Sequence, residues 1–234
     1  MALLLSPNSP PSLSRRVRLA QELATSVSYV HTFDFVHKNI RPESVLVFQE
    51  KENSQLDTCA TAMITTNQRS RFLIRFESFR AAETGSNFIG DLDRGSNIYR
   101  HPERMGQRPA EAYQIQYDIY SLGVCLLEIG LWEPLVEYPS VGPTSEPKYG
   151  RVGRDFDSTG KDWLLFKDYL VVLTENELPR RIGDLNADVV VTCLTCLDKN
   201  GNFDDEAEVA DADGIPVGVR FIEMISGQLK EIVL

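Results

Sequence analysis

Residues 37–47 read HKNIRPESVLV and join a predicted helix to a predicted strand. In front of them, residues 14–31 carry apolar side chains at three- and four-residue spacing, which predicts a helix that buries one face. Behind them, residues 45–48 (VLVF) form a β-branched and aromatic run that is typical of a short strand. Pro42 interrupts regular structure between the two. The stretch is therefore predicted to be a loop that ends in a strand.

The rest of the chain predicts a mainly helical domain. Alternating apolar and polar side chains over residues 72–79 predict a second short strand that pairs with the first. Residues 117–132 (YDIYSLGVCLLEIGLW) are apolar almost all round, as expected of a helix at the centre of a domain. Further helices are predicted over residues 161–178, 187–197 and 217–233, whereas 80–116 and 134–160 are predicted to be irregular.

Four sequence features stand in the order found in the C-terminal lobe of protein kinases. HKNIRPES keeps the frame of the kinase catalytic loop, H-R-D-L-x-x-x-N. A predicted strand pair follows, then residues 99–103 (YRHPE) where kinases carry A-P-E, and residues 118–124 (DIYSLGV) resemble the central helix of that lobe. The chain therefore resembles a protein-kinase-like C-terminal lobe. The resemblance implies that residues 14–234 have a mainly α (α+β) fold with a short β-hairpin. Pro7, Pro10 and Pro11 in a serine-rich context predict a disordered N-terminus at residues 1–13.

A narrower resemblance comes from four stretches of sequence from residue 99 onward. YRHPER is followed by DIYSLGVCLLEIGLW, then by ELPRRIGD and VVVTCLTCLD. This combination resembles a fungal group of kinase-like domains that are attached to HeLo-type cell-death or prion-associated domains. The resemblance implies a regulatory role in fungal cell-death signalling, with protein partners or an adjacent effector domain.

The catalytic residues depart from the kinase pattern. Phosphoryl transfer uses an Asp that accepts the substrate hydroxyl proton, and an Asn and a second Asp that hold Mg²⁺. Within the loop His37 and Arg41 keep the frame, but Asn39 stands at the position of the base, and an amide cannot take a proton at neutral pH. Ser44 stands at the position of the metal-binding Asn, where it would be a weaker, single-oxygen ligand.

The D-F-G position can be read in two registers. With Phe76 as the Phe, Arg75 replaces the Asp, and its fixed positive charge would repel Mg²⁺. A shift of two residues would offer Glu77 instead. The first register is preferred because Phe76 and Arg80 then both match the kinase pattern. We therefore expect no bound cofactor and no metal, and no Mg²⁺-ATP site with kinase geometry.

Only 36 residues precede His37, which accommodates one long helix. An N-lobe is thus expected to be absent, together with its glycine-rich loop and lysine. The resulting prediction is a pseudokinase C-lobe that is not an enzyme and acts as a protein-interaction or regulatory scaffold. The alternative is a fragment of a divergent protein kinase, an ATP-dependent phosphotransferase, whose N-lobe lies outside this chain. A nonfunctional gene remnant is the third hypothesis.

Asp118, Pro102 and Glu103 are expected to stabilise the fold of the lobe. In the kinase resemblance, Asp118 accepts backbone N–H bonds from the catalytic loop, and His37 packs beside it. A buried carboxylate needs such donors. Pro102 and Glu103 form the A-P-E-like turn, and the resemblance implies that Glu103 pairs with a buried arginine. The candidates for this pairing are Arg180, Arg181 and Arg220.

Composition excludes several other classes of function. The formal net charge of −10 argues against a nucleic-acid groove or an anionic membrane surface. No segment reaches the roughly 18 to 20 apolar residues of a membrane span. Four cysteines are too few for a disulfide framework, and Cys193 and Cys196 are expected to be buried structural thiols, not a zinc site. An intracellular, cytoplasmic protein is therefore predicted.

Overall fold

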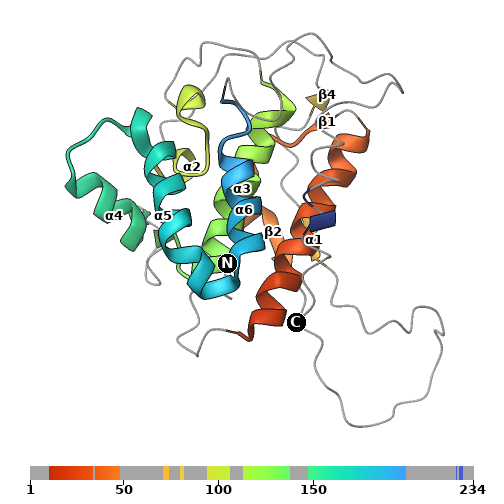
Figure 1. Cartoon of the computed structure of the whole chain (residues 1–234). Helices are drawn as coiled ribbons and strands as arrows, with labels where there is room; N and C mark the ends of the chain where they lie inside the picture. Colours follow the sequence, from red (N-terminus) through yellow and green to blue (C-terminus); the bar gives the residue numbers. More distant parts are fainter. Residues whose placement is uncertain are drawn as a thin grey trace, which may run out of the picture.

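A computed structural model describes residues 11–33, 35–47, 71–73, 80–81, 94–105, 113–137, 147–198, 225, 227 and 228. This part of the chain is mostly helical with small antiparallel strand pairs (Figure 1). Most of the helix predicted at residues 217–233 lies outside it, as do residues 1–10 of the predicted disordered N-terminus. The proposed division into residues 1–13 and 14–234 therefore stays a prediction.

Helix α3 (Ile115–Leu131) runs through the centre of the fold, as its apolar sequence predicts. Every residue from Tyr117 to Leu131 is buried. The helix packs against α1 (Leu13–Thr32), α5 (Phe166–Ile182) and α6 (Asp184–Leu194), which surround it (Figure 1). It ends one residue before the predicted limit, because Trp132 takes a left-handed conformation with φ of 55°.

Helix α1 confirms the prediction for residues 14–31 almost to the residue. Its buried side chains are those with three- and four-residue spacing: Val17, Leu19, Ala20, Leu23, Ala24, Val27 and His31. The Nη1 atom of Arg16 donates a hydrogen bond to the carbonyl oxygen of Gly130 at 2.8 Å. A helix end leaves such carbonyls without intrahelical partners, so Arg16 of α1 satisfies one at the end of α3.

The strands in the described residues form three separate antiparallel pairs. In the first, β2 (Val45–Val47) pairs with β3 (Arg71–Leu73), which places Leu46 opposite Phe72. This confirms the predicted pairing for residues 71–73, while 74–79 lie outside the described residues. The other two pairs were not predicted, and each strand in them is two residues long: β1 (Phe35–Val36) with β4 (Arg80–Ala81), and β5 (Val136–Glu137) with β6 (Lys148–Tyr149).

Residues 134–160 are not irregular throughout, so that prediction is wrong in part. Besides β5 and β6 they contain helix α4 (Arg151–Ser158). Gly150, which favours an irregular structure when read alone, sits at the start of this helix and donates its N–H to the carbonyl of Leu135 at 2.7 Å. A Cβ atom at this position would lie 1.9 Å from the carbonyl oxygen of Pro134. The glycine therefore permits a close backbone approach that starts a helix.

The next predicted helices are present with shifted ends. The segment predicted at 161–178 begins with the 3₁₀ turn η4 (Trp163–Leu165) and continues as α5 to Ile182. Gly183, with φ of 87°, separates α5 from α6. The described residues also contain three short elements, α2 (Arg94–Asn97), η1 (Pro42–Ser44) and η3 (Pro102–Arg104). None of the helices in the described ranges is long and apolar enough to cross a bilayer.

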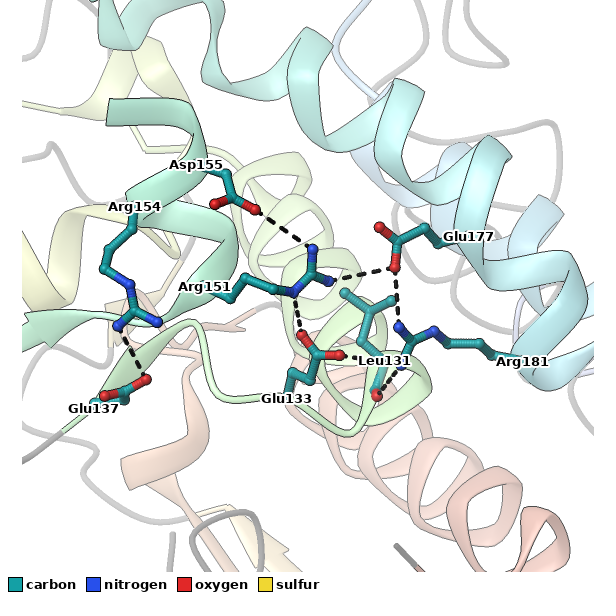
Figure 2. Close-up of polar contacts among 8 residues, drawn as sticks. All are labelled: Leu131, Glu133, Glu137, Arg151, Arg154, Asp155, Glu177 and Arg181. Carbon is teal, nitrogen blue, oxygen red and sulfur yellow. Dashed lines mark hydrogen bonds and ion pairs between the residues drawn. The ribbon is translucent and has the colours of Figure 1, made fainter. Parts of the chain in front are cut away.

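A network of ion pairs joins α4, α5 and the segment after α3 (Figure 2). Arg151 of α4 contacts Glu133 at 2.6 Å and Glu177 at 3.3 Å. Arg181 of α5 contacts the same two carboxylates, each at 3.1 Å, and donates to the carbonyl of Leu131 at 3.0 Å. Single exposed ion pairs contribute little to stability, but shared partners fix the relative position of the three segments.

Candidate functional site

The Asp118 carboxylate holds the loop at residues 37–44 in place. Its Oδ2 atom accepts the backbone N–H of His37 at 2.6 Å and contacts His31 Nε2 at 3.1 Å. Its Oδ1 atom accepts the backbone N–H of Lys38 at 2.9 Å and the hydroxyl of Tyr113 at 2.7 Å. The carboxylate is fully buried, so these four contacts replace its hydration.

The hydrogen bonds also set the charge of this carboxylate. Burial raises the pKa of Asp118, but the contact with His31 and the hydrogen bonds from His37 and Tyr113 outweigh burial and hold the pKa below its ordinary value. Asp118 is therefore an anion at neutral pH. Neither His31 nor Tyr113 was expected at this position from the sequence.

Hydrogen bonds to Asp118 and within the loop fix the conformation of residues 37–44. Lys38 takes a left-handed conformation with φ of 64°, which is uncommon for a residue other than glycine and is stabilised here by its bond to Asp118. The hydroxyl of Ser44 donates to the carbonyl of Arg41 at 2.7 Å and accepts the backbone N–H of Arg41 at 3.1 Å. Ser44 is fully buried. Its oxygen is thus committed to the loop backbone and does not fit the role of a magnesium ligand.

The side chain of Arg41 points to the segment that contains α2. Its Nη1 atom donates to the hydroxyl of the buried Ser96, and its Nε atom lies 3.8 Å from Glu43 Oε2. Asn39, between these anchored residues, is half-buried and precedes the buried Ile40. The loop therefore presents an amide where the kinase pattern has a carboxylate. The second predicted site segment, Arg75, Phe76 and Glu77, lies outside the described residues.

Two aromatic rings connect the loop to the turn η3. The Nζ atom of Lys38 lies 5.0 Å from the centre of the Tyr113 ring, and the guanidinium of Arg104 lies 5.3 Å from the same ring. Arg104 also lies 5.4 Å from the Tyr117 ring. Cations over aromatic faces are attracted by the ring quadrupole. The HKNIRPES loop and the turn η3 thus meet at Tyr113.

Glu103 does not form the expected ion pair with Arg180 or Arg181. Its side chain is 62% exposed, with Oε2 3.4 Å from the Tyr117 hydroxyl and 3.6 Å from His101 Nδ1. Arg181 instead contacts Glu133 and Glu177 in the described structure. Arg220, the remaining candidate, lies outside the described residues. Pro102, at the first position of η3, is buried, and in this part of the chain Glu103 contacts an aromatic hydroxyl rather than an arginine.

Glu128 is a buried carboxylate near the site that sequence reasoning missed. Its Oε1 atom accepts the backbone N–H of Leu135 at 2.8 Å, and the Tyr99 hydroxyl lies 3.2 and 3.3 Å from its two oxygens. Burial raises the pKa of Glu128 to about 8, and the nearby charge of Glu43 adds to this. The signal in the sequence was a charged residue in the otherwise apolar second half of the central helix, ten positions after Asp118.

The pKa of Glu128 predicts a specific pH dependence of folding. Between about pH 4.5 and pH 8 the folded state holds a proton that the unfolded state releases, so its contribution to stability falls as pH rises through this window. One bound proton corresponds to a slope of up to about 1.4 kcal/mol per pH unit. Glu128→Gln should remove this slope. Urea unfolding at pH 5, 6, 7 and 8 measures it.

A matched control for Glu128→Gln is Asp188→Asn, which changes an exposed carboxylate on α6. This variant should keep the pH profile of the parent protein. Parallel profiles for the parent and Glu128→Gln would contradict the raised pKa of Glu128.

The cysteines of the C-x-x-C pair are buried, as predicted. Cys193 is fully buried and Cys196 is 3% exposed, and burial raises the pKa of both thiols. The thiol of Cys196 lies 3.3 Å from the carbonyl of Gln116. Among the described residues, no group of three or more His, Cys, Asp or Glu side chains is placed to hold a metal ion.

Comparison with known proteins finds partial matches to protein kinases. No family model matches the chain. The mitogen-activated protein kinase kinase mkk2 of Aspergillus fumigatus is 23% identical over 135 residues, which are 58% of this chain and 22% of that protein. A MAP kinase kinase of Saccharomyces cerevisiae is 24% identical over 112 residues, which are 48% of this chain and 17% of that protein. The serine/threonine-protein kinase PknD of Protochlamydia amoebophila is 28% identical over 118 residues, 50% of this chain and 12% of that protein.

These matches support a kinase-like relationship and span less than a quarter of each relative. They contradict the prediction that the chain is not an enzyme, because the relatives are named as protein kinases. That prediction rested on Asn39, Ser44 and Arg75 and on an N-lobe that was expected to be absent. Phosphoryl transfer depends mainly on positioning and electrostatic stabilisation, so the loss of one proton acceptor does not by itself exclude it.

Proposed function

We propose that the described residues form the C-terminal lobe of a divergent protein kinase that transfers a phosphoryl group from ATP to a protein hydroxyl. The observation that carries this proposal is the Asp118 carboxylate, which accepts the backbone N–H groups of His37 and Lys38. These contacts hold HKNIRPES in one conformation at the place where the kinase pattern puts its catalytic loop. The named relatives, all protein kinases, support the proposal.

In this function the residues of the loop bind and orient the substrate. The Asn39 side chain can accept a hydrogen bond from the substrate hydroxyl through its amide oxygen, but it cannot remove the proton. The transition state of phosphoryl transfer is loose, so orientation of the hydroxyl is the larger requirement. Arg41, held by Ser96 and Glu43, carries a positive charge at the same loop. We therefore expect transfer to be slow and to depend on the loop conformation.

Thermal unfolding of the full-length protein tests whether nucleotide binds. A ligand that binds only the folded state raises stability by RT ln(1 + [L]/Kd). At a ligand concentration of 100 times Kd this is about 2.7 kcal/mol, which corresponds to an increase in Tm of about 5 to 11 °C for a domain of this size. We expect millimolar Mg²⁺-ATP to raise Tm. The same increase with Mg²⁺-GTP, or none with either, would contradict an ATP site.

Binding of other proteins in a regulatory role is the second candidate function, and it is compatible with phosphoryl transfer. The observation that favours it is a group of exposed leucine and valine side chains at the start of α5, a helix whose opposite face fills the core. The resemblance to fungal kinase-like domains would assign such binding to cell-death signalling, with HeLo-type domains as neighbours. Co-purification of the full-length protein with a neighbouring domain of that type, in the absence of nucleotide, would test it.

A further inference from the structure

The outer face of α5, together with the turn η4 that precedes it, carries a stripe of exposed side chains. Leu165, the last residue of η4, is followed at three- and four-residue spacing by Asp168, Val172 and Glu175 of α5, which places them on one side of the helical segment. Leu165 is 47% exposed and Val172 is 55% exposed, and the adjoining Leu164 is 61% exposed. Three large apolar side chains therefore lie in water within about two helical turns.

The opposite face of α5 already supplies the packing that the fold needs. Its buried residues include Phe166, Leu170, Leu173 and Leu178, and α5 packs against α3 and α6 (Figure 1). Single exposed leucines are common on protein surfaces, but neighbouring exposed apolar residues often mark interaction sites. The outer apolar side chains of α5 are therefore not explained by the packing of the described structure.

Acidic side chains border the apolar ones. Asp168 and Glu175 alternate with Leu165 and Val172 along the stripe, and both are exposed. The positive charge of the neighbouring Lys167 does not fully neutralise these two carboxylates. Its ammonium group lies 3.8 Å from Asp168 but also bonds to Asp198, and its side chain is only 16% exposed. Apolar and negatively charged side chains thus alternate along the stripe.

We propose that this stripe, formed by Leu164, Leu165, Asp168, Val172 and Glu175, binds a basic amphipathic helix of a protein partner. A partner helix with apolar residues at positions i, i+3 or i+4, and i+7 would cover the exposed leucines and valine. Lysines or arginines beside those positions would face Asp168 and Glu175, which gives the complementary charge. The proposal does not depend on phosphoryl transfer, because α5 lies outside the loop of residues 37–44.

The probe for this surface is a synthetic helical peptide of about 16 residues with leucines on one face and lysines at its flanks. Fluorescence anisotropy of the labelled peptide with the full-length protein measures its dissociation constant. The paired variant Leu165→Ser and Val172→Ser removes apolar side chains that are already in water, so the fold should persist. We expect binding to weaken at least tenfold, because apolar anchors dominate interface affinity.

Charge is tested separately. The paired variant Asp168→Asn and Glu175→Gln keeps side-chain size and removes two negative charges. We expect binding to weaken about three- to tenfold at low salt, and the salt dependence of binding to decrease, because exposed charges attract less as the ionic strength rises. A second peptide, in which every lysine is replaced by glutamate, should bind at least tenfold more weakly than the basic one.

A matched control lies on another helix. Tyr29 and Phe33 at the end of α1 are 67% and 70% exposed, so Tyr29→Ser with Phe33→Ser removes a larger exposed hydrophobic surface away from α5. This control should change the dissociation constant by less than about twofold.

Three outcomes would overturn the proposal. In the first, the α1 control weakens binding as much as the α5 pair, which would mean general hydrophobic adsorption. In the second, the acidic peptide binds as well as the basic one. In the third, the protein self-associates in analytical ultracentrifugation and only the Leu165→Ser, Val172→Ser variant is monomeric, which would assign the stripe to a second copy of this chain.

Discussion

Replacing Asn39 by aspartate should accelerate phosphoryl transfer by about 10²- to 10⁴-fold, the usual contribution of a positioned general base. The substitution keeps the shape of the side chain and adds a carboxylate that can accept the substrate hydroxyl proton. The surrounding loop is already anchored by Asp118 and by the Ser44 to Arg41 bonds, so the new carboxylate would enter a site whose backbone is in place. Transfer of labelled phosphate from ATP to a protein substrate by the full-length protein measures this effect.

Asn176→Asp is the matched control for this experiment. Asn176 is an exposed asparagine on α5, so the change adds the same negative charge at a distance from the loop. The control should leave the rate of transfer unchanged. Measurable transfer by the parent protein with no acceleration in Asn39→Asp would show that Asn39 does not stand at the position of the base. Absence of transfer in both proteins would contradict the proposed enzymatic function itself.

The helices could be predicted because their signals are local. The spacing of apolar residues in α1 and the continuous apolar run in α3 each determine a buried surface, and both elements match the prediction within two residues at each end. Helix α4 escaped prediction because its start depends on a contact between Gly150 and the carbonyl of Pro134, 16 positions earlier in the chain. A glycine read alone indicates a turn, and only the tertiary contact shows that a helix begins there.

The candidate site was predicted only in part, because some of its contacts depend on tertiary packing. The motif in residues 37–44 placed Asp118 beside the loop, since the kinase resemblance carries that contact. His31 and Tyr113 could not be found in this way, because His31 is 87 positions from Asp118 and its buried position follows from the packing of α1 on α3. The expected pairing of Glu103 with Arg180 or Arg181 is not formed, although its motif was recognisable. Its carboxylate is exposed and Arg181 contacts Glu133 and Glu177, while Arg220 lies outside the described residues.

The substitution Asp118→Asn should destabilise the fold by about 3 to 5 kcal/mol, the usual cost of removing one partner from a buried charged network. Four donors or cations converge on this carboxylate: the backbone N–H groups of His37 and Lys38, the Tyr113 hydroxyl and His31 Nε2. An asparagine offers a single acceptor oxygen and an NH₂ group that itself donates. The new NH₂ group then faces at least one of these buried donors. That donor loses its acceptor, and leaving it buried without one costs its full desolvation free energy. Urea unfolding of both proteins at pH 7 measures the difference.

The pH dependence of this loss distinguishes a lost charge from a general packing defect. The pKa of Asp118 is lowered in the fold, so its stabilisation is complete above its unfolded value near 3.8 and disappears as the pH falls below it. The difference in stability between the parent protein and Asp118→Asn should therefore shrink in acid, whereas a packing defect would keep it constant. Glu128, ten positions later on the same helix, has a raised pKa. It therefore changes the stability at higher pH, between about 4.5 and 8. Because the two carboxylates shift in opposite directions, the stability lost in Asp118→Asn should be constant above about pH 3.8 and change with pH only in the acid limb, whereas the effect of Glu128→Gln should change with pH between about 4.5 and 8. A constant loss across both limbs in either variant would contradict the charge states derived for this helix.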